Sequence, residues 1–244
     1  EMGLHPEHSH HESGPGQNEV CFLYTGALRS ADNLNTFKST VKAIAARNGL
    51  FASFMPKPLA DQPGSGLHVN ISLLRDGKNL FEGELAPGSE GAHFVAGVLA
   101  HARELTAFCN PVPNSYARLG ANEAPLYVSW SRQNRSQLVR LPSARGELCR
   151  VELRGPDPAG NPYLVIGLIL AAGLDGIQRE LPLPEAVNRN LFLPSAAAGL
   201  ECLPRTLREA ITVAAQSEFI SRELPIALQN KYFQYQTLLC HGFE

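Results

Sequence analysis

Apolar residues recur at helical spacing in four segments of the chain. The first follows Ser30, ends before Gly49, and builds its apolar face from Leu34, Phe37, Val41 and Ile44. The same step of three or four residues predicts further helices over residues 89–108, 162–177 and 204–214. The most apolar run, residues 163–174, is too short to span a bilayer and predicts a buried helix.

Shorter segments predict strands, at residues 20–24, 50–55, 67–74, 126–130 and 149–153. Between Leu74 and Leu80, the segment Arg75-Asp76-Gly77-Lys78 predicts a hairpin turn. Helices and strands are mixed without a regular β–α alternation, which favours an α+β fold over a doubly wound sheet. A chain of 244 residues has room for one large domain or two small ones.

The strand predicted at residues 67–74 carries polar residues on one face only. His68, Asn70 and Ser72 alternate with apolar neighbours, so their side chains point together and away from the core. Just before them, Gly64-Ser65-Gly66 forms a loop whose backbone can approach a ligand closely. This polar face is therefore a candidate binding surface.

The strand predicted at residues 149–153 has a charged face made of Arg150, Glu152 and Arg154. By itself, this face is open to interpretation as a surface ladder of ion pairs, which stabilises little. It follows a stretch without lysine that contains Arg118, Arg132, Arg135, Arg140 and Arg145. Sixteen of the 21 basic residues are arginine, which binds phosphates and carboxylates with two parallel hydrogen bonds. The combination suits a triphosphate with its metal ions.

The N-terminal segment from His5 to Glu12 is rich in groups that ligate metals. A zinc cluster and an exposed polar strand are both open interpretations, and the strand is favoured. Glu12 and Glu19 flank Gly14-Pro15-Gly16, a turn that can bring the two carboxylates together. Such hard oxygen ligands suit Mg²⁺ or Mn²⁺ rather than zinc.

Charge and cysteine content narrow the class of protein. Charged residues make up 18% and the formal net charge is −2, which gives no basis for binding nucleic acid or a membrane surface. The five cysteines are odd in number and widely spaced, as expected for reduced thiols in the cytoplasm. No signal peptide opens the chain, and its first residue is Glu1, so we expect an upstream segment.

Five collinear segments resemble glutamine synthetase. They are residues 10–12 with 16–19, Phe54-Met55-Pro56-Lys57-Pro58, Gly64-Ser65-Gly66-Leu67-His68, residues 110–119 with 123–125 and 134–136, and residues 150–164. The resemblance covers Glu7 to about Leu174 and weakens towards Leu228. It implies that residues 1–244 are part of a catalytic domain with a curved antiparallel sheet and helices on its outer face.

The resemblance also implies a ligand set. Two or three Mg²⁺ or Mn²⁺ ions are expected per site, one held by Glu12 and Glu19 and another by His68 and Glu152. The implied substrate-binding residues are Gly64, Arg118, Glu123, Arg135 and Arg154. Those implied for ATP are Glu7, Asn70, Ser72, Arg135, Arg140 and Arg150. Glu123, on a flap where it would accept a proton from ammonium, and Arg135 are implied to be catalytic.

The implied reaction joins ammonia to glutamate through a γ-glutamyl phosphate and yields glutamine, ADP and phosphate. Its partners are glutamate, ammonium or another amine, ATP, and further copies of the chain in a ring-shaped dodecamer. In the family, an E-x-E strand and a small β-domain lie upstream of the position that Glu1 occupies. We therefore expect this chain alone to be inactive.

Several residues depart from the family pattern. Pro63 stands where the family usually has Asn beside the substrate, Asn70 where it has a second His, and Glu147 where it has a basic residue. Phe192 replaces a tyrosine that some bacterial members adenylylate, which excludes that modification there. A ligase for polyamines or other amines is one alternative. A non-catalytic member of the family is another.

Overall fold

A sheet of four short strands lies at the centre of the fold, in the order β3-β8-β7-β6. The computed structural model describes residues 2–83 and 85–241. The strands are β3 (Val69–Ile71), β6 (Trp130–Ser131), β7 (Val139–Arg140) and β8 (Val151–Leu153). Strand β8 is antiparallel to β3 and β7, whereas β6 and β7 are parallel. The α+β class is confirmed, and one strand pair departs from the antiparallel expectation.

Two hairpins flank this sheet. The first pairs β1 (Pro6–His11) with β2 (Asn18–Phe22), so the polar N-terminal segment is an exposed strand. The second pairs β4 (Leu74–Arg75) with β5 (Lys78–Asn79). Asp76 and Gly77 both have positive φ, 50° and 75°, the conformation that a tight two-residue hairpin turn requires. The predicted turn is confirmed.

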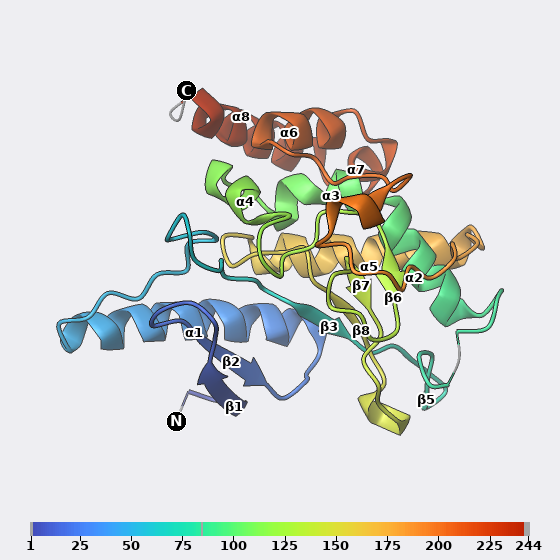
Figure 1. Ribbon diagram of the computed structural model, residues 1–244, viewed down its shortest axis with the longest axis horizontal. Helices are drawn as coiled ribbons and strands as arrows, with labels where there is room; N and C mark the ends of the chain where they lie inside the picture. Colours follow the sequence, from blue (N-terminus) through green and yellow to red (C-terminus); the bar gives the residue numbers. More distant parts are fainter. Residues whose placement is uncertain (1, 84, 242–244) are drawn as a thin grey trace.

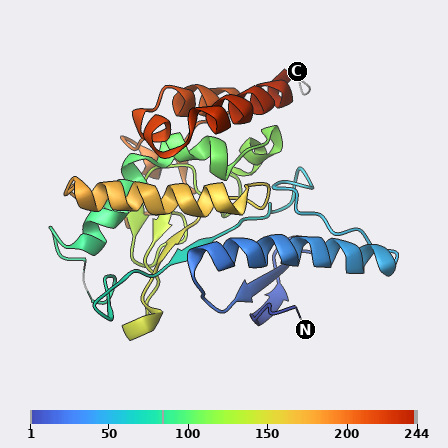
Figure 2. The same ribbon diagram turned by 180° about the vertical axis from the view of Figure 1, so that it is seen from behind.

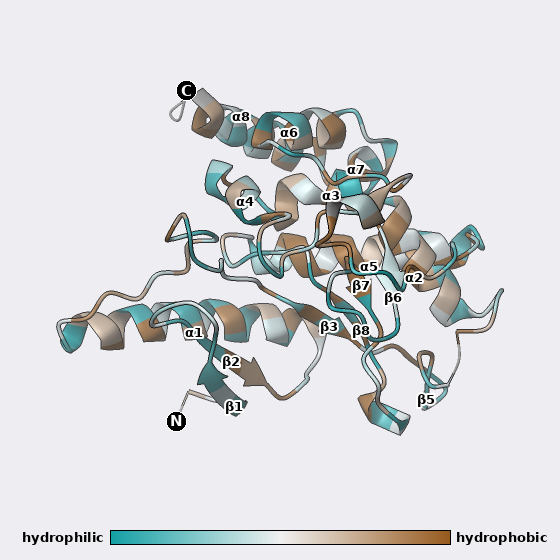
Figure 3. Ribbon diagram, in the orientation of Figure 1, coloured by the Kyte–Doolittle hydropathy of each residue, from teal (hydrophilic) through white to brown (hydrophobic). Residues whose placement is uncertain are grey.

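Helices cover the apolar face of the sheet. They are α2 (Glu90–Ala100), α3 (Ala102–Cys109) and α5 (Pro162–Gln178). Val139, Val151 and Leu153 of the sheet share one core with Val98, Leu105 and Ile169 of these helices. Figure 2, the view from behind, shows α5 crossing in front of the sheet, and Figure 3 shows how much of α5 is hydrophobic. The opposite face of the sheet is thereby left for polar side chains.

The remaining helices lie on either side of this core (Figure 1). Helices α6 (Leu207–Ala215), α7 (Glu218–Glu223) and α8 (Ile226–His241) form an outer layer over α3. Helix α4 (Pro113–Arg118) leads into the site, and α1 (Ala27–Arg47) runs beside the β1–β2 hairpin. Two short 3₁₀ turns span Gly146–Leu148 and Pro194–Ala197. In the described residues, no helix is long and apolar enough to cross a membrane.

The four predicted helices are present, but the second is broken at His101 into α2 and α3. The strand predicted at residues 50–55 is wrong, because that segment belongs to no strand. The strand predicted at residues 126–130 is reduced to an isolated bridge between Tyr127 and Cys202 and to Trp130 in β6. Helices α4, α7 and α8 were not predicted. An alternating pattern marks extended backbone, but a strand also needs a neighbour to pair with.

Helices α2 and α5 approach each other closely because glycines face each other across their contact. A Cβ added to Gly97 would lie 2.2 Å from the carbonyl oxygen of Ala172 and 2.7 Å from Cα of Gly176. Both neighbours are backbone atoms of α5, so they cannot rotate out of the way. By contrast, a Cβ added to Gly167, on the exposed face of α5, would meet nothing within 4 Å.

We expect Gly97→Ala to lower the free energy of unfolding by about 1–3 kcal/mol, because the helices must separate. Gly167→Ala is the matched control and should raise it by up to about 1 kcal/mol, since alanine favours the helix more than glycine does. Urea unfolding of the purified chain measures both. Equal stabilities for the two variants would contradict this account of the contact.

His101, at the break between α2 and α3, ties the outer helices to the core. Its Nδ1 lies 2.6 Å from Glu104 and its Nε2 2.8 Å from Asp175, while its ring stacks on Phe219 of α7. Asp175 also accepts hydrogen bonds from Arg179 and Arg222. Burial lowers the pKa of His101, but hydrogen bonds to Glu104 and Asp175 outweigh it, so the pKa is raised. Two carboxylates at the two ring nitrogens favour the imidazolium form.

A raised pKa in the folded state means that the stabilisation by His101 is complete below its ordinary pKa of 6.5. It is lost as the pH rises through the higher folded-state pKa. We therefore expect the free energy of unfolding to fall across this range in the unmodified chain and to change less in His101→Gln. Thermal unfolding at a series of pH values tests this. Parallel pH profiles for the two proteins would refute it.

Candidate active site

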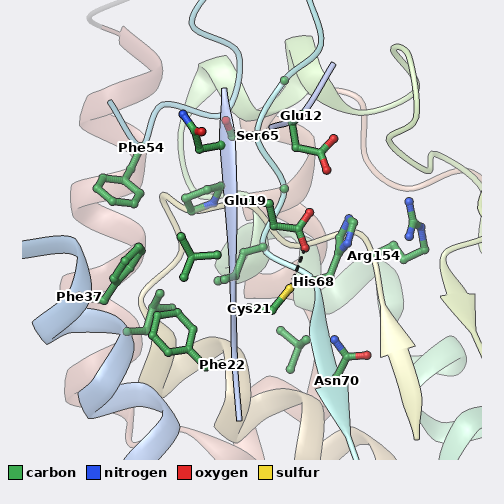
Figure 4. Close-up of a pocket in the computed structure, with 18 of the residues that line it drawn as sticks. Glu12, Glu19, Cys21, Phe22, Phe37, Phe54, Ser65, His68, Asn70 and Arg154 are labelled. Atoms are coloured by element: carbon green, nitrogen blue, oxygen red, sulfur yellow. Dashed lines mark hydrogen bonds between the residues drawn. The ribbon is translucent and has the colours of Figure 1, made fainter. Parts of the chain in front are cut away.

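A cavity of about 490 Å³ opens between the β1–β2 hairpin, α1 and the exposed edge of β3. One wall is apolar and includes Phe22, Phe37 and Phe54, whose rings pack edge to face. The other wall is polar and charged, and it includes Glu12, Glu19, His68, Glu152, Arg118 and Arg154. Figure 4 shows the three phenylalanines on one side and Glu12, Glu19, His68 and Arg154 on the other.

The β1–β2 hairpin gathers three groups that can ligate a metal. His10 lies directly opposite Glu19 in the strand register, and Glu12 follows at the end of β1. One potential ligand atom from each of the three lies within 4.8 Å of the others. Nε2 of His10 is 3.0 Å from Oε1 of Glu12 and 3.9 Å from Oε2 of Glu19. The arrangement can hold one divalent cation.

A second pair of candidate ligands comes from β8 and from the segment entering β3. Nδ1 of His68 lies 3.4 Å from Oε1 of Glu152. Burial, and next the charge of Arg154, lower the pKa of His68 to about 3. Its imidazole is therefore neutral at physiological pH, the form that ligates metals.

Glu152 is buried, with 5% of its surface exposed, and is balanced by two arginines. Nε of Arg140 donates a short hydrogen bond to Oε2, and Nη1 of Arg154 donates to Oε1 over 3.3 Å. Burial raises the pKa of Glu152, but the Arg140 hydrogen bond and neighbouring charges, that of Arg154 among them, outweigh burial and lower it. Glu152 is thus an anion at neutral pH.

The strand register aligns three polar residues in a row across the sheet. Asn70 of β3 pairs with Glu152 of β8, which pairs with Arg140 of β7. At the edge of this row, Nε of Arg150 donates to Oδ1 of Asn70 over 3.1 Å. The open face of the sheet therefore carries two guanidinium groups beside one carboxylate, an arrangement suited to a phosphate ligand.

Arg118 and Arg154 sit at the floor of the cavity beside the glycine loop. Arg118 is buried and donates to the carbonyl oxygens of Gly155 and Arg154 over 2.8 and 3.2 Å. Burial lowers its pKa to about 10, so it remains cationic at neutral pH. Among the described residues, Nε of the buried Arg154 finds no hydrogen-bond acceptor. The cavity is thus lined by two buried guanidinium groups, whose positive charge favours an anionic ligand.

Comparison with known proteins identifies the family. Residues 1–238 match the family described as "Glutamine synthetase, catalytic domain". This chain belongs to the glutamine synthetase catalytic-domain family. Its relatives include glutamine synthetases of Staphylococcus epidermidis and Staphylococcus aureus, each 44% identical over 246 residues and 98% of this chain. The chain spans 55% of the length of each of these glutamine synthetases.

Two solved structures share the fold. One, described as "GmaS/ADP complex-Conformation 1", has a TM-score of 0.90 and 35% identity, and covers 99% of this chain and 57% of that one. The other, "Apo GmaS without ligand", has a TM-score of 0.87 and 34% identity, and covers 99% of this chain and 56% of that one. The fold expected from the glutamine-synthetase resemblance is thereby confirmed.

The structure distributes the residues implied by glutamine synthetase over two regions. Glu12, Glu19, Gly64, His68, Asn70, Arg118, Glu123, Glu152 and Arg154 all line the cavity. Glu123 is exposed, on a turn in which Asn122 has a φ of 52°. Arg140 and Arg150 lie outside the cavity but contact its wall through Glu152 and Asn70.

Three further implied residues, Glu7, Ser72 and Arg135, also lie outside the cavity lining. Arg135 is exposed on the loop between β6 and β7, and Glu7 is exposed on β1 beside His8. The hydroxyl of Ser72 donates to the carbonyl oxygen of Cys149 over 2.8 Å. Glu7 still lies near the cavity, which Cys21 lines. Burial is the main cause of the raised pKa of the Cys21 thiol, the charge of Glu7 raises that pKa further, and the charge of Arg150 lowers it.

Sequence reasoning missed two residues at this site. His10 was not assigned as a ligand, although residues two apart in a strand share a face, so His10 and Glu12 were a detectable pair. Gln17 was part of a recognised motif but had no assigned role. Its side chain reaches Gly64 and Ser65, 47 and 48 residues away, and no local pattern signals such a contact.

Removing the charge of Glu152 should destabilise the chain, because two guanidinium groups would lose their counter-charge. We expect Glu152→Gln to lower the free energy of unfolding by about 3 kcal/mol. Glu147→Gln, which alters an exposed carboxylate, is the control and should change it by less than about 0.5 kcal/mol. Denaturant titration at pH 7 measures both. Equal effects would mean that the buried ion network contributes no net stability.

Proposed function

We propose that the protein containing this chain is an ATP-dependent ligase that joins an amine to glutamate. The supporting observation is the convergence on one cavity of two candidate cation sites with two buried arginines, Arg118 and Arg154. Family membership supports the same class of reaction, and a structural relative is described as an ADP complex. Because the chain spans about half of its relatives' length, the activity belongs to the whole protein.

The donor atoms fit divalent metal ions. His10, Glu12 and Glu19 would hold one ion, and His68 with Glu152 a second. Carboxylate oxygens dominate the set, which suits Mg²⁺ or Mn²⁺. When bound, such ions neutralise charge on phosphate oxygens. Glu152 is shared between His68 and two arginines, so it links the candidate metal site to the phosphate-facing row of the sheet.

The proposed reaction has two steps. The side-chain carboxylate of glutamate attacks the terminal phosphorus of ATP, which forms γ-glutamyl phosphate and releases ADP. The amine then attacks the acyl carbon, the amide bond forms, and phosphate leaves. Arg140 and Arg150, with Arg135 from its loop, would balance charge on the phosphates. Arg118 and Arg154 would hold the carboxylates of glutamate, and Glu123 would accept the proton that the amine loses.

The acceptor amine has two candidates. Relatives named glutamine synthetase favour ammonium, which would make glutamine the product. The match to GmaS, together with Pro63 at a position where the family usually has Asn, favours a larger amine as the second candidate. As in the family, we propose a homo-oligomer of the dodecamer type.

An amine panel tests the activity. The full-length protein encoded by the gene is incubated with ATP, glutamate, Mn²⁺ and either ammonium, methylamine or a polyamine, and phosphate release is measured. We expect one amine to stimulate release strongly, and Arg154→Ala to reduce it by about a thousandfold. Absence of amine-dependent release with every acceptor, alongside tight ATP binding, would favour a non-catalytic member of the family.

The cation site can be tested in the chain itself. We expect Glu12→Gln and Glu19→Gln each to weaken Mn²⁺ binding at least tenfold, because each removes one anionic ligand. Glu185→Gln alters an exposed carboxylate outside the cavity lining and is the control. Isothermal titration with Mn²⁺ gives the affinities. Unchanged binding in both variants would place the ion elsewhere.

A further inference from the structure

We propose that Gln17 is a positioning residue that couples the cation site on the β1–β2 hairpin to the Gly64-Ser65-Gly66 loop at the substrate end of the cavity. The inference rests on the proposed function, which assigns a cation to the hairpin and a substrate to the loop. It goes beyond that function by assigning a residue that binds neither metal nor substrate and that controls how the two sites influence each other.

Gln17 first fixes the hairpin turn that separates Glu12 from Glu19. Its backbone N–H donates to Gly14 over 3.1 Å, and its carbonyl accepts from the N–H of Glu12 over 3.0 Å. Its side-chain Oε1 accepts from the N–H of Gly14 over 3.0 Å. A Cβ on Gly14 would lie only 2.7 Å from this oxygen, so a larger residue there would have to displace the amide. The side-chain oxygen of Gln17 thus bonds within the β1–β2 hairpin that carries Glu12 and Glu19.

The side-chain nitrogen of the same amide hydrogen bonds to the Gly64-Ser65-Gly66 loop. Nε2 donates to the carbonyl oxygen of Gly64 over 3.0 Å and to Oγ of Ser65 over 3.3 Å. Gln17 is half-buried, and these bonds span 47 and 48 positions of the sequence. A single planar amide therefore connects the two segments, and one cannot shift without pulling or breaking bonds to the other.

The loop is closely packed on its far side. A Cβ on Gly64 would lie 2.4 Å from the carbonyl oxygen of Pro56, and one on Gly66 would lie 2.7 Å from Nη2 of Arg118 and 3.1 Å from Nε2 of His68. The N–H of Ser65 donates to the same Pro56 oxygen over 2.8 Å. The loop is held between Gln17 on one side and Arg118 and His68 on the other.

This arrangement gives a path from one end of the site to the other. A cation that draws Glu12 and Glu19 together acts on the turn that Gln17 closes, and Gln17 passes the displacement to the loop. The loop touches Arg118, the proposed carboxylate ligand, and His68, the proposed ligand of the second ion. By linkage, if a bound cation changes the affinity of the loop for a ligand, that ligand changes the affinity of the hairpin for the cation by the same factor.

Amide hydrogen exchange of the chain with and without Mn²⁺ tests the coupling. In the unmodified chain, we expect Mn²⁺ to slow exchange in residues 12–19 and also in residues 64–67. Gln17→Glu keeps an oxygen for the N–H of Gly14 but cannot donate to Gly64, so Mn²⁺ should slow exchange in the hairpin alone. Gln17→Met removes all three side-chain hydrogen bonds, to Gly14, Gly64 and Ser65, and should raise exchange in residues 64–67 about fivefold without metal.

Asn18→Ala is the matched control, because among the described residues the side-chain amide of Asn18 hydrogen bonds only to the carbonyl oxygen of Gly16, within the exposed hairpin. Amide exchange in residues 64–67 of this variant should match that of the unmodified chain, with and without Mn²⁺. A loop that responds to Mn²⁺ equally in the unmodified chain and in Gln17→Glu would overturn the coupling. If Mn²⁺ slows exchange in neither segment of the unmodified chain, the proposed cation site itself fails. Equal metal-free exchange in Gln17→Met and the unmodified chain would refute the tie between the segments.

Discussion

The buried carboxylate of Glu152 constrains the rest of this structure. An anion this far from water is stable only if cations and hydrogen bonds surround it, and Arg140 and Arg154 supply both. The two guanidinium groups in turn need Glu152, so β7, β8 and the segment after β8 must stay in register. One face of the sheet is therefore committed to charge, and the sheet packs its apolar side chains on the other face against α2, α3 and α5.

The β1–β2 hairpin stands apart from that sheet and contributes a second set of charged groups. The Gln17 amide connects this hairpin to Gly64 and Ser65 of the glycine loop. The cavity is thus lined by two parts of the fold, the hairpin on one side and the sheet with its glycine loop on the other. Such a division suits a site in which metal ions and a phosphate ligand complete the charge balance between the two walls.

Membership of the glutamine synthetase family explains why the cavity combines carboxylates with arginines, and leaves the acceptor amine as the open chemical question. Most of the residues proposed to bind phosphate and metal match the family segments. Pro63 and Asn70, which depart from the family pattern, lie on the loop and strand that border the cavity. Neither residue is charged, so these differences leave the buried charges of Arg118, Glu152 and Arg154 in place.

The sequence by itself determined the helices α1, α5 and α6, the turn at Asp76 and Gly77, and the alternation that puts Glu152 and Asn70 on the polar face. These features follow from local backbone preference and periodicity, which act between near neighbours. Tertiary structure alone decided that residues 50–55 form no strand, that Arg118 donates to the carbonyl oxygen of Gly155, and that Gln17 contacts Ser65. Pairing and ligation depend on atoms brought together from distant positions, and no local pattern encodes that distance.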